Sequence, residues 1–259
     1  MGITVAVDGA VAVVTIEQPS RRNAMTLEMR AQAQREFERL CDDPEVRAIV
    51  LTGAGEHFSA GADVSDMGQS GVGGSILKMR YIHRMVRAVN RTEKPVIAAV
   101  RGVCIGMSWS LALACDFVIA AVDARFQFAF RHLGLAPDGG AVFQLTRLVG
   151  LQRAKEIIYS GRFISGSEAR SLGLALEALP ADEVLSRALA FAGELALAPT
   201  TAIAMAKRQF DAAPAQTLDQ ALDFEGVMQA AMINTDDFRE GAAAFREKRK
   251  PSWYRPRLS

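Results

Sequence analysis

The sequence predicts an α/β fold that ends in a helical C-terminal region. Residues 3–7 and 11–16 show the two-residue alternation of strands and flank Asp8-Gly9, a dipeptide typical of hairpin turns. Patterns of buried strands and of helices then recur in the order strand, strand, helix. Past Gly150 almost every segment has helical spacing.

Apolar spacing places the individual elements. The first helix is expected at 25–43, where Leu27, Phe37 and Leu40 are among the apolar positions, and a buried strand follows at 47–55. The later elements are a helix at 75–90, a buried strand at 94–106, a helix running into a strand at 107–121, and helices at 141–150, 151–161, 165–173, 181–198, 200–213, 217–234 and 235–251. Thr235 gives the last of these helices a capping start.

The composition is that of a folded protein with little net charge. The chain has 259 residues, 50% of them hydrophobic, and a formal net charge of +1. This balance argues against disorder, and against nucleic acid or an anionic membrane as a partner. No apolar run reaches the roughly 18 residues that span a bilayer, and the N-terminus lacks the pattern of a secretory signal. Three cysteines without a CxxC pair fit a reducing, cytoplasmic setting.

Several familiar motifs fail on close inspection. Gly53 and Gly55 match the start of a dinucleotide fingerprint, but Phe58 takes the place of its third glycine. The three histidines form no HxxxH pair, so no metal site is expected. The serines in GMSWS, at 106–110, miss the GxSxG pattern of a nucleophile elbow.

Two loops of small residues remain as a candidate site. They span 58–67 and 101–116, and each follows an apolar strand. The second loop leads into a helix, whose first N–H groups favour negative charge. Two such loops side by side can hold an oxyanion, although each loop taken alone is equally compatible with a tight turn.

The central segments resemble those of the crotonase family, the enoyl-CoA hydratases and isomerases. They read HFSAGADVSDM, KPVIAAVRGVCIGMSWSLALACDFVIAA and RFQFAFRHLGLAPDGGAVFQLTRLVG, and the later GSEARSLGLALEALPADE and FREGAAAFREKRKPSW resemble the family too. The match covers nearly the whole chain in order. It implies a crotonase-like spiral of ββα units with a CoA-thioester site at 1–195, and a helical region at 196–259 that makes a homotrimer or hexamer.

The resemblance also implies which residues form the site. The oxyanion donors are the N–H groups of Ala62 and Met107. The residues implied in binding CoA, mostly through the backbone, are Arg22, Asn23, Ala24, Met25, Ser59, Ala60 and Asp63, with Lys248 and Lys250 as weaker candidates for its phosphates. The acyl pocket would include Phe130, Ser110 and Met67.

Two departures from the family pattern decide between activities. The two glutamates that activate water in the hydratases fall at Ser110 and Phe130 in this sequence. Asp138 falls where some isomerases of the family carry their acidic residue, and the wording of its segment is most similar to the phenylacetate-pathway isomerases. Asp138 could cap a helix as well as act in catalysis, and because Asn caps about as well as Asp, Asp138→Asn is expected to change stability little.

The most favoured function is therefore the shift of a C=C bond in an enoyl-CoA, from Δ3 to Δ2. It requires no metal or redox cofactor, because CoA arrives as part of the substrate. Two alternatives stay open at this point. One is an enoyl-CoA hydratase or another lyase or hydrolase of the same fold, and the other is a non-catalytic protein that binds CoA thioesters or RNA.

Overall fold

The computed structural model describes residues 1–66 and 71–253. The strands are β1 (Gly2–Asp8), β2 (Val11–Glu17), β3 (Ala48–Gly53), β4 (Val96–Val100), β5 (Val103–Ile105), β6 (Phe117–Ala121), β7 (Arg125–Gln127), β8 (Ile164–Ser165) and β9 (Glu177–Leu179). The helices are α1 (Leu27–Asp42), α2 (Gly71–Arg91), α3 (Met107–Leu113), α4 (Ala141–Ser160), α5 (Gly166–Ser171), α6 (Val184–Ala196), α7 (Thr200–Ala212), α8 (Leu218–Met232) and α9 (Asp236–Glu247).

The strands form two sheets. The larger has six strands in the order β1-β2-β3-β4-β6-β9, and the smaller has three in the order β5-β7-β8. The predicted hairpin is confirmed, since β1 and β2 pair antiparallel with Asp8 opposite Val11. From β2 to β9 the large sheet is parallel.

From β4 onward the chain winds as a spiral between the two sheets. It passes from β4 to β5 and later from β6 to β7. The single strand expected at 94–106 is therefore wrong, because Gly102 bends the chain from one sheet to the other at a φ of 55°. A Cβ at Gly102 would lie 2.4 Å from the carbonyl oxygen of Glu56, so only glycine fits this turn.

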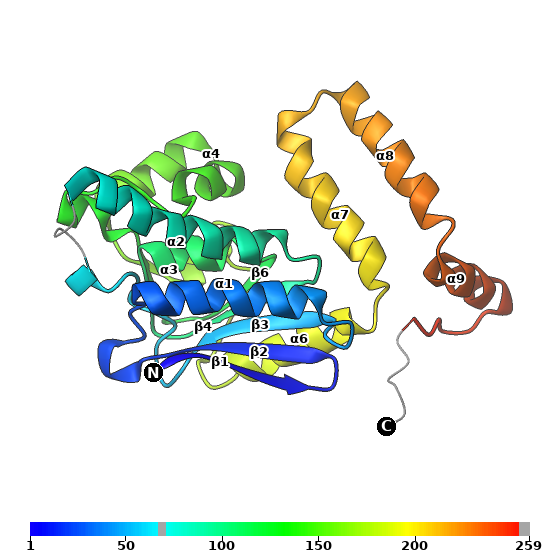
Figure 1. Ribbon diagram of the computed structural model, residues 1–259, viewed down its shortest axis with the longest axis horizontal. Coiled ribbons are helices and arrows are strands. Elements are labelled where there is room, and N and C mark those ends of the chain that lie inside the picture. Colours follow the sequence, from blue (N-terminus) through cyan, green and yellow to red (C-terminus); the bar gives the residue numbers. More distant parts are fainter. Residues whose placement is uncertain (67–70, 254–259) are drawn as a thin grey trace.

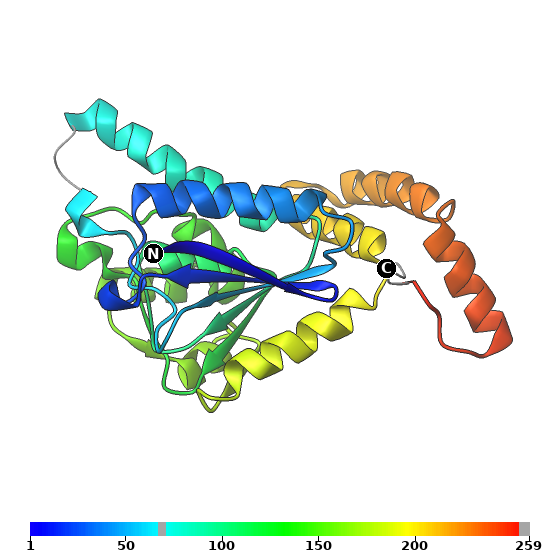
Figure 2. The same cartoon turned by 60° about the horizontal axis from the view of Figure 1, so that its bottom comes forward.

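Helices cover both faces of the large sheet. Figures 1 and 2 show α1 and α2 on one face and α6 on the other. All residues of β3 and β4 are buried. Parallel strands enclosed in this way are apolar without alternation, which is the pattern that the sequence showed at 47–53 and 95–100.

Helices α7, α8 and α9 form a C-terminal arm that extends away from the two sheets (Figure 1). The domain boundary expected at 195/196 falls in the last turn of α6. Lys207 ties the first arm helix to the core, since its Nζ lies 2.7 Å from a carboxylate oxygen of Asp116 and 2.9 Å from the carbonyl oxygen of Lys94. Thr235 caps α9 as expected, because its hydroxyl accepts a hydrogen bond from the N–H of Phe238.

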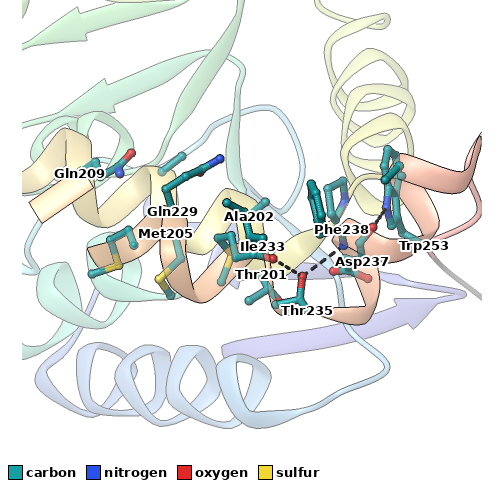
Figure 3. Close-up of a pocket in the computed structure, with 16 residues that line it drawn as sticks. Thr201, Ala202, Met205, Gln209, Gln229, Ile233, Thr235, Asp237, Phe238 and Trp253 are labelled. Carbon is teal, nitrogen blue, oxygen red and sulfur yellow. Dashed lines mark hydrogen bonds between the residues drawn. The ribbon is translucent and has the colours of Figure 1, made fainter. Parts of the chain in front are cut away.

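The arm carries apolar surface that the described chain leaves uncovered. No residue of α8 is buried, and Phe210 and Phe245 are 80% and 86% exposed. A partly open cavity of about 380 Å³ lies between α7, α8 and α9, and Met205, Met228 and Met232 are among the residues that line it. Figure 3 shows this cavity and its lining residues. At one side Trp253 donates a 2.9 Å hydrogen bond from its indole Nε1 to the carbonyl oxygen of Asp237.

Within the described ranges, no single helix has the length and apolar character needed to cross a membrane. Helices α6 and α7 pass such a test only when taken together, although they meet at a bend of 106°. Helix α6 packs on the large sheet, and its apolar face is buried in the core.

Candidate active site

The loop after β3 is held in an extended form by two short backbone pairings. Ser59 pairs with Cys104 in β5, and Ala62 pairs with Met25. The second pairing uses the N–H and the carbonyl of Met25, which bond to Gly61 O at 2.8 Å and to the N–H of Asp63 at 3.0 Å. Because both main-chain groups of an extended residue point to the same side, the N–H of Ala62 points away from Met25.

The second loop brings the N–H of Met107 to the same place. Met107 is the first residue of α3, after Gly106 at a φ of 57°. Gly61 packs against this loop so closely that a Cβ there would lie 2.7 Å from Ile105 O and 3.9 Å from the nitrogen of Met107. Within the described parts of the chain, neither the Ala62 nor the Met107 N–H has a protein acceptor. The fold thus brings together two unused backbone donors from separate loops.

Asn23 organises the neighbouring loop, where it has a φ of 57° and is fully buried. Its side-chain nitrogen donates to Ala54 O at 2.8 Å and to His57 O at 2.7 Å, and its side-chain oxygen accepts from the N–H of Gln18. These side-chain hydrogen bonds connect Asn23 to the main chain at Gln18, Ala54 and His57. The Asn23 side chain therefore builds the loop, and the main-chain N–H groups of 22–25 are likewise bonded within the protein.

Ser59 and Asp63 are committed in the same way. The Ser59 hydroxyl donates to Asn23 O at 2.6 Å and accepts from the Ser108 hydroxyl at 2.6 Å. The Asp63 carboxylate accepts from Arg21 at 2.7 Å and from Ser65, and these bonds lower its pKa against the effect of burial. The structure thus brings Arg22, Asn23, Ala24 and Met25 next to Ser59, Ala60 and Asp63, with the polar side chains of this group largely used in folding.

Two parts of the expected site are not joined to this cluster. Lys248 ends α9 at a φ of 53°, and it lies with Lys250 on the exposed end of the arm. Figure 1 shows this end far from the loops that carry Asn23 and Ala62. Met67, expected in the acyl pocket, lies outside the described residues.

Asp138 is not a helix cap, so that reading is wrong. Helix α4 begins at Ala141, its N-cap residue is Gly140, and no side chain caps it. Gly139 and Gly140 both have positive φ values, of 61° and 84°. They turn the chain between Asp138 and the helix, so the carboxylate is directed elsewhere.

One oxygen of the Asp138 carboxylate, Oδ1, is instead buried and makes no hydrogen bond with any of the described residues. Burial raises the pKa of Asp138 to about 6, and the nearby positive charge of Arg30 offsets part of the rise. A carboxylate that titrates close to neutral pH and keeps an oxygen free is suited to take and return a proton.

Ser110 and Phe130 lie where the family pattern suggested water-activating acids, and neither side chain is an acid. Ser110 is fully buried, and its hydroxyl donates to the main-chain oxygen of Asp138 at 2.9 Å. Phe130 is buried and stacks on Phe128, which stacks in turn on Trp109 with ring centres 4.2 Å apart. These rings form an apolar layer beside α3.

Arg30 is a feature of the site that sequence reasoning missed. It lies on the inner face of α1 with Ala33 and Phe37, is only 3% exposed, and donates to Met25 O at 2.7 Å. A charged residue at an inward helical position is a signal that the sequence does carry. Arg30 supports the loop of Ala62 and also contributes charge near Asp138.

In the described parts of the chain, no three His, Cys, Asp or Glu side chains gather in a way that would hold a metal ion.

Comparisons with known proteins show what this chain is similar to. The family model "Enoyl-CoA hydratase/isomerase" matches residues 6–256. This chain belongs to the enoyl-CoA hydratase/isomerase family. It is 34% identical to the 1,2-epoxyphenylacetyl-CoA isomerase of Escherichia coli, over 95% of this chain and 96% of that protein. It is 33% identical to the short-chain-enoyl-CoA hydratase of Clostridium acetobutylicum, over 96% of each chain.

A solved structure extends the match to three dimensions. The crystal structure of an enoyl-CoA hydratase from Polaromonas sp. JS666 superposes with a TM-score of 0.94 at 32% identity, and covers 97% of this chain and 99% of that one. The crotonase fold expected from the sequence is thereby confirmed. As a member of this family the protein is an enzyme of acyl-CoA metabolism, and relatives named as isomerase and as hydratase stand at similar identity.

Asp138→Asn is expected to stabilise the folded protein at neutral pH. Asp138 has a pKa of about 6 in the folded state against 3.8 for an ordinary aspartate, so its ionisation costs stability as pH rises through this window. The variant should gain on the order of 1–3 kcal/mol above pH 6. The gain should disappear below about pH 3.8, where the aspartic acid is neutral in both states. Urea unfolding of both proteins across this pH range measures the difference, and an equal gain at every pH would show that Asp138 is not desolvated.

Proposed function

We propose that the protein shifts a C=C bond in enoyl-CoA thioesters, from Δ3 to Δ2, with Asp138 as the single base. The observation that carries this proposal is the buried Asp138 carboxylate oxygen without a partner. Burial holds its pKa at about 6, which suits a group that must both accept and return a proton near neutral pH.

The proton balance of the reaction needs only one such group. A 3-enoyl-CoA has acidic protons at C2, between the thioester carbonyl and the double bond. Asp138 takes one of them, the electron pair spreads into a dienolate, and the negative charge gathers on the thioester oxygen. The N–H groups of Ala62 and Met107 donate to that oxygen. Asp138 then returns the proton to C4, so the double bond lies between C2 and C3, and no electrons leave the substrate. The step therefore requires no redox cofactor or metal.

CoA is proposed to bind along the backbone of 22–25 and 59–63. This assignment is supported by the match of both segments to the family model, which spans residues 6–256. Lys248 and Lys250 would serve CoA phosphates only on another copy of the chain, because the arm carries them away from their own loops.

The same arm supports a trimer, or a dimer of trimers, as the working form. Its first helix is tied to the core through Lys207, while α8 buries no residue and large apolar side chains are exposed. A monomer would leave this surface in water.

Hydration of 2-enoyl-CoA is the second candidate function. It is favoured by the names of similar proteins, such as the short-chain-enoyl-CoA hydratase. Against it stand the Ser110 hydroxyl, which is used on a main-chain oxygen, and the apolar ring of Phe130.

Asp138→Asn should lower isomerisation by about 10²- to 10⁴-fold, the usual contribution of a positioned base. The amide keeps the shape of the side chain but cannot accept the C2 proton. Turnover of 3-enoyl-CoA and exchange of the C2 proton with deuterated solvent should fall together. A folded variant that isomerises at the wild-type rate would place the base elsewhere.

Ala62→Pro should lower turnover by about 10²- to 10³-fold, the usual cost of losing one oxyanion donor. Its N–H makes no hydrogen bond within the described protein, so the change removes a donor to substrate without breaking a pairing. Binding of CoA, measured by calorimetry, should persist. Full turnover in the variant would refute the assignment of the oxyanion site.

Hydration of crotonyl-CoA should be slow compared with isomerisation of a 3-enoyl-CoA. No carboxylate stands at Ser110 or Phe130 to activate water. The loss of the enoyl absorbance measures hydration directly. Comparable rates for the two reactions would make the hydratase the correct function.

The protein should have the mass of three or six chains in solution. Phe245→Asp together with Phe210→Asp should weaken this assembly, since both side chains are highly exposed on the arm. Light scattering at micromolar concentration measures both masses. A monomeric wild-type protein would contradict the proposal.

A further inference from the structure

We propose that Ser110 is a positioning residue, which fixes the Asp138 carboxylate relative to the oxyanion donors by holding the main chain at Asp138. This inference rests on the proposed role of Asp138 as the base.

The contact is a buried hydrogen bond between two elements that carry the chemistry. Ser110 lies within α3, is fully buried, and donates from its hydroxyl to Asp138 O at 2.9 Å. Met107, whose N–H is one of the oxyanion donors, is the first residue of the same helix. The first residue of this short helix, Met107, supplies an oxyanion donor, and its fourth residue, Ser110, bonds to the main chain of the base Asp138.

Gly139 seats the loop directly on this serine. A Cβ built at Gly139 would lie 2.8 Å from the Ser110 Cβ and 3.7 Å from Cγ2 of Ile82 in α2. The backbone of Gly139 has a φ of 61°, which side-chain-bearing residues rarely adopt. The backbone of Gly139 thus packs directly against Ser110 and Ile82, and the hydrogen bond from the Ser110 hydroxyl fixes the position of this loop.

The carboxylate itself has little else to orient it. Its buried Oδ1 has no partner in the described structure, so its position follows from its backbone. The preceding loop is exposed, with Leu133 and Leu135 both largely in solvent. A base that must remain free of strong partners needs its anchor on the main chain, and Ser110 supplies one.

The charges around Asp138 do not provide this anchor. Arg30 from α1 is the described group whose charge acts on it, and the side chains nearest a Cβ built at Gly139, Ser110 from α3 and Ile82 from α2, are uncharged. The pH dependence of catalysis therefore reports the burial of the carboxylate together with the charge of Arg30.

Ser110→Ala is the decisive variant, because it removes the hydrogen bond and keeps the Cβ under Gly139. The kcat for 3-enoyl-CoA should fall about 10- to 100-fold, as expected when a base shifts by about 1 Å, while KM stays within about threefold. The acidic limb of the kcat profile should move toward lower pH, because a looser loop admits water to the carboxylate. Unchanged kcat and an unchanged profile would overturn the proposal.

Thr52→Val is the matched control. Its hydroxyl donates to Ala99 O at 3.0 Å, also from a buried side chain to a main-chain oxygen, but between β3 and β4. This variant should lose stability as Ser110→Ala does, with kcat and its pH profile unchanged. An equal loss of kcat in both variants would mean that general destabilisation explains the effect.

Ser110→Cys keeps a weak hydrogen-bond donor, so its kcat should fall between those of the wild type and Ser110→Ala. A Ser110→Cys variant slower than Ser110→Ala would count against the hydrogen bond.

A readout without catalysis separates this proposal from the proposed function. The pH-dependent stability gain of Asp138→Asn should be at least halved when it is measured in the Ser110→Ala background, because the loosened carboxylate is already hydrated. The comparison of the two single variants with the double variant is a double-mutant cycle. If the wild-type protein does not isomerise enoyl-CoA, the proposed function fails, but the cycle still tests whether Ser110 holds Asp138. If the wild type isomerises and the two substitutions have additive effects on stability, the role of Ser110 is refuted and the proposed function stands.

Discussion

The close approach of two loops at Gly61 is the constraint on which the site depends. A side chain there would collide with Ile105 O, so the loop after β3 can lie against the start of α3 only with a hydrogen at this position. That contact brings the N–H groups of Ala62 and Met107 together. The pairing of Ser59 with Cys104, which adds the loop to the small sheet, keeps the approach in register.

Around this contact, polar side chains hold main-chain segments together, because a buried polar group without a partner is costly. Asn23 bonds to main-chain atoms, Ser59 bonds to the main-chain oxygen of Asn23 and to the Ser108 hydroxyl, and the Asp63 carboxylate accepts from Arg21 and Ser65. Asp138 departs from this pattern, with a buried carboxylate oxygen left open. The Trp109 indole nitrogen and the Thr92 hydroxyl are also buried without a partner in the described structure, but neither is a base. Such an unsatisfied group is expected where chemistry requires it and is destabilising elsewhere.

Much of the fold was predictable because its signals are local. The hairpin at Asp8-Gly9, the buried strand expected at 47–55 and the cap at Thr235 each follow from a few neighbouring residues. All three are confirmed, the strand over Ala48–Gly53. The strand at 94–106 was wrong because an apolar run does not show that a glycine in its middle turns the chain into another sheet. The reading of Asp138 as a cap failed similarly, since Gly139 and Gly140 move the helix start to Ala141.

The sequence by itself determined the fold, the family and the residue types at the site. Those follow from apolar spacing and from motifs whose order along the chain is preserved. Only the tertiary structure decided what each group does. It used the Asn23 side chain in folding, buried Arg30 beside Met25, and left one carboxylate oxygen of Asp138 buried and unpaired, with the Ser110 hydroxyl bonded to the main-chain oxygen of Asp138. The reason is that burial, and the neighbours that satisfy or leave open a polar group, come from segments far apart in the sequence.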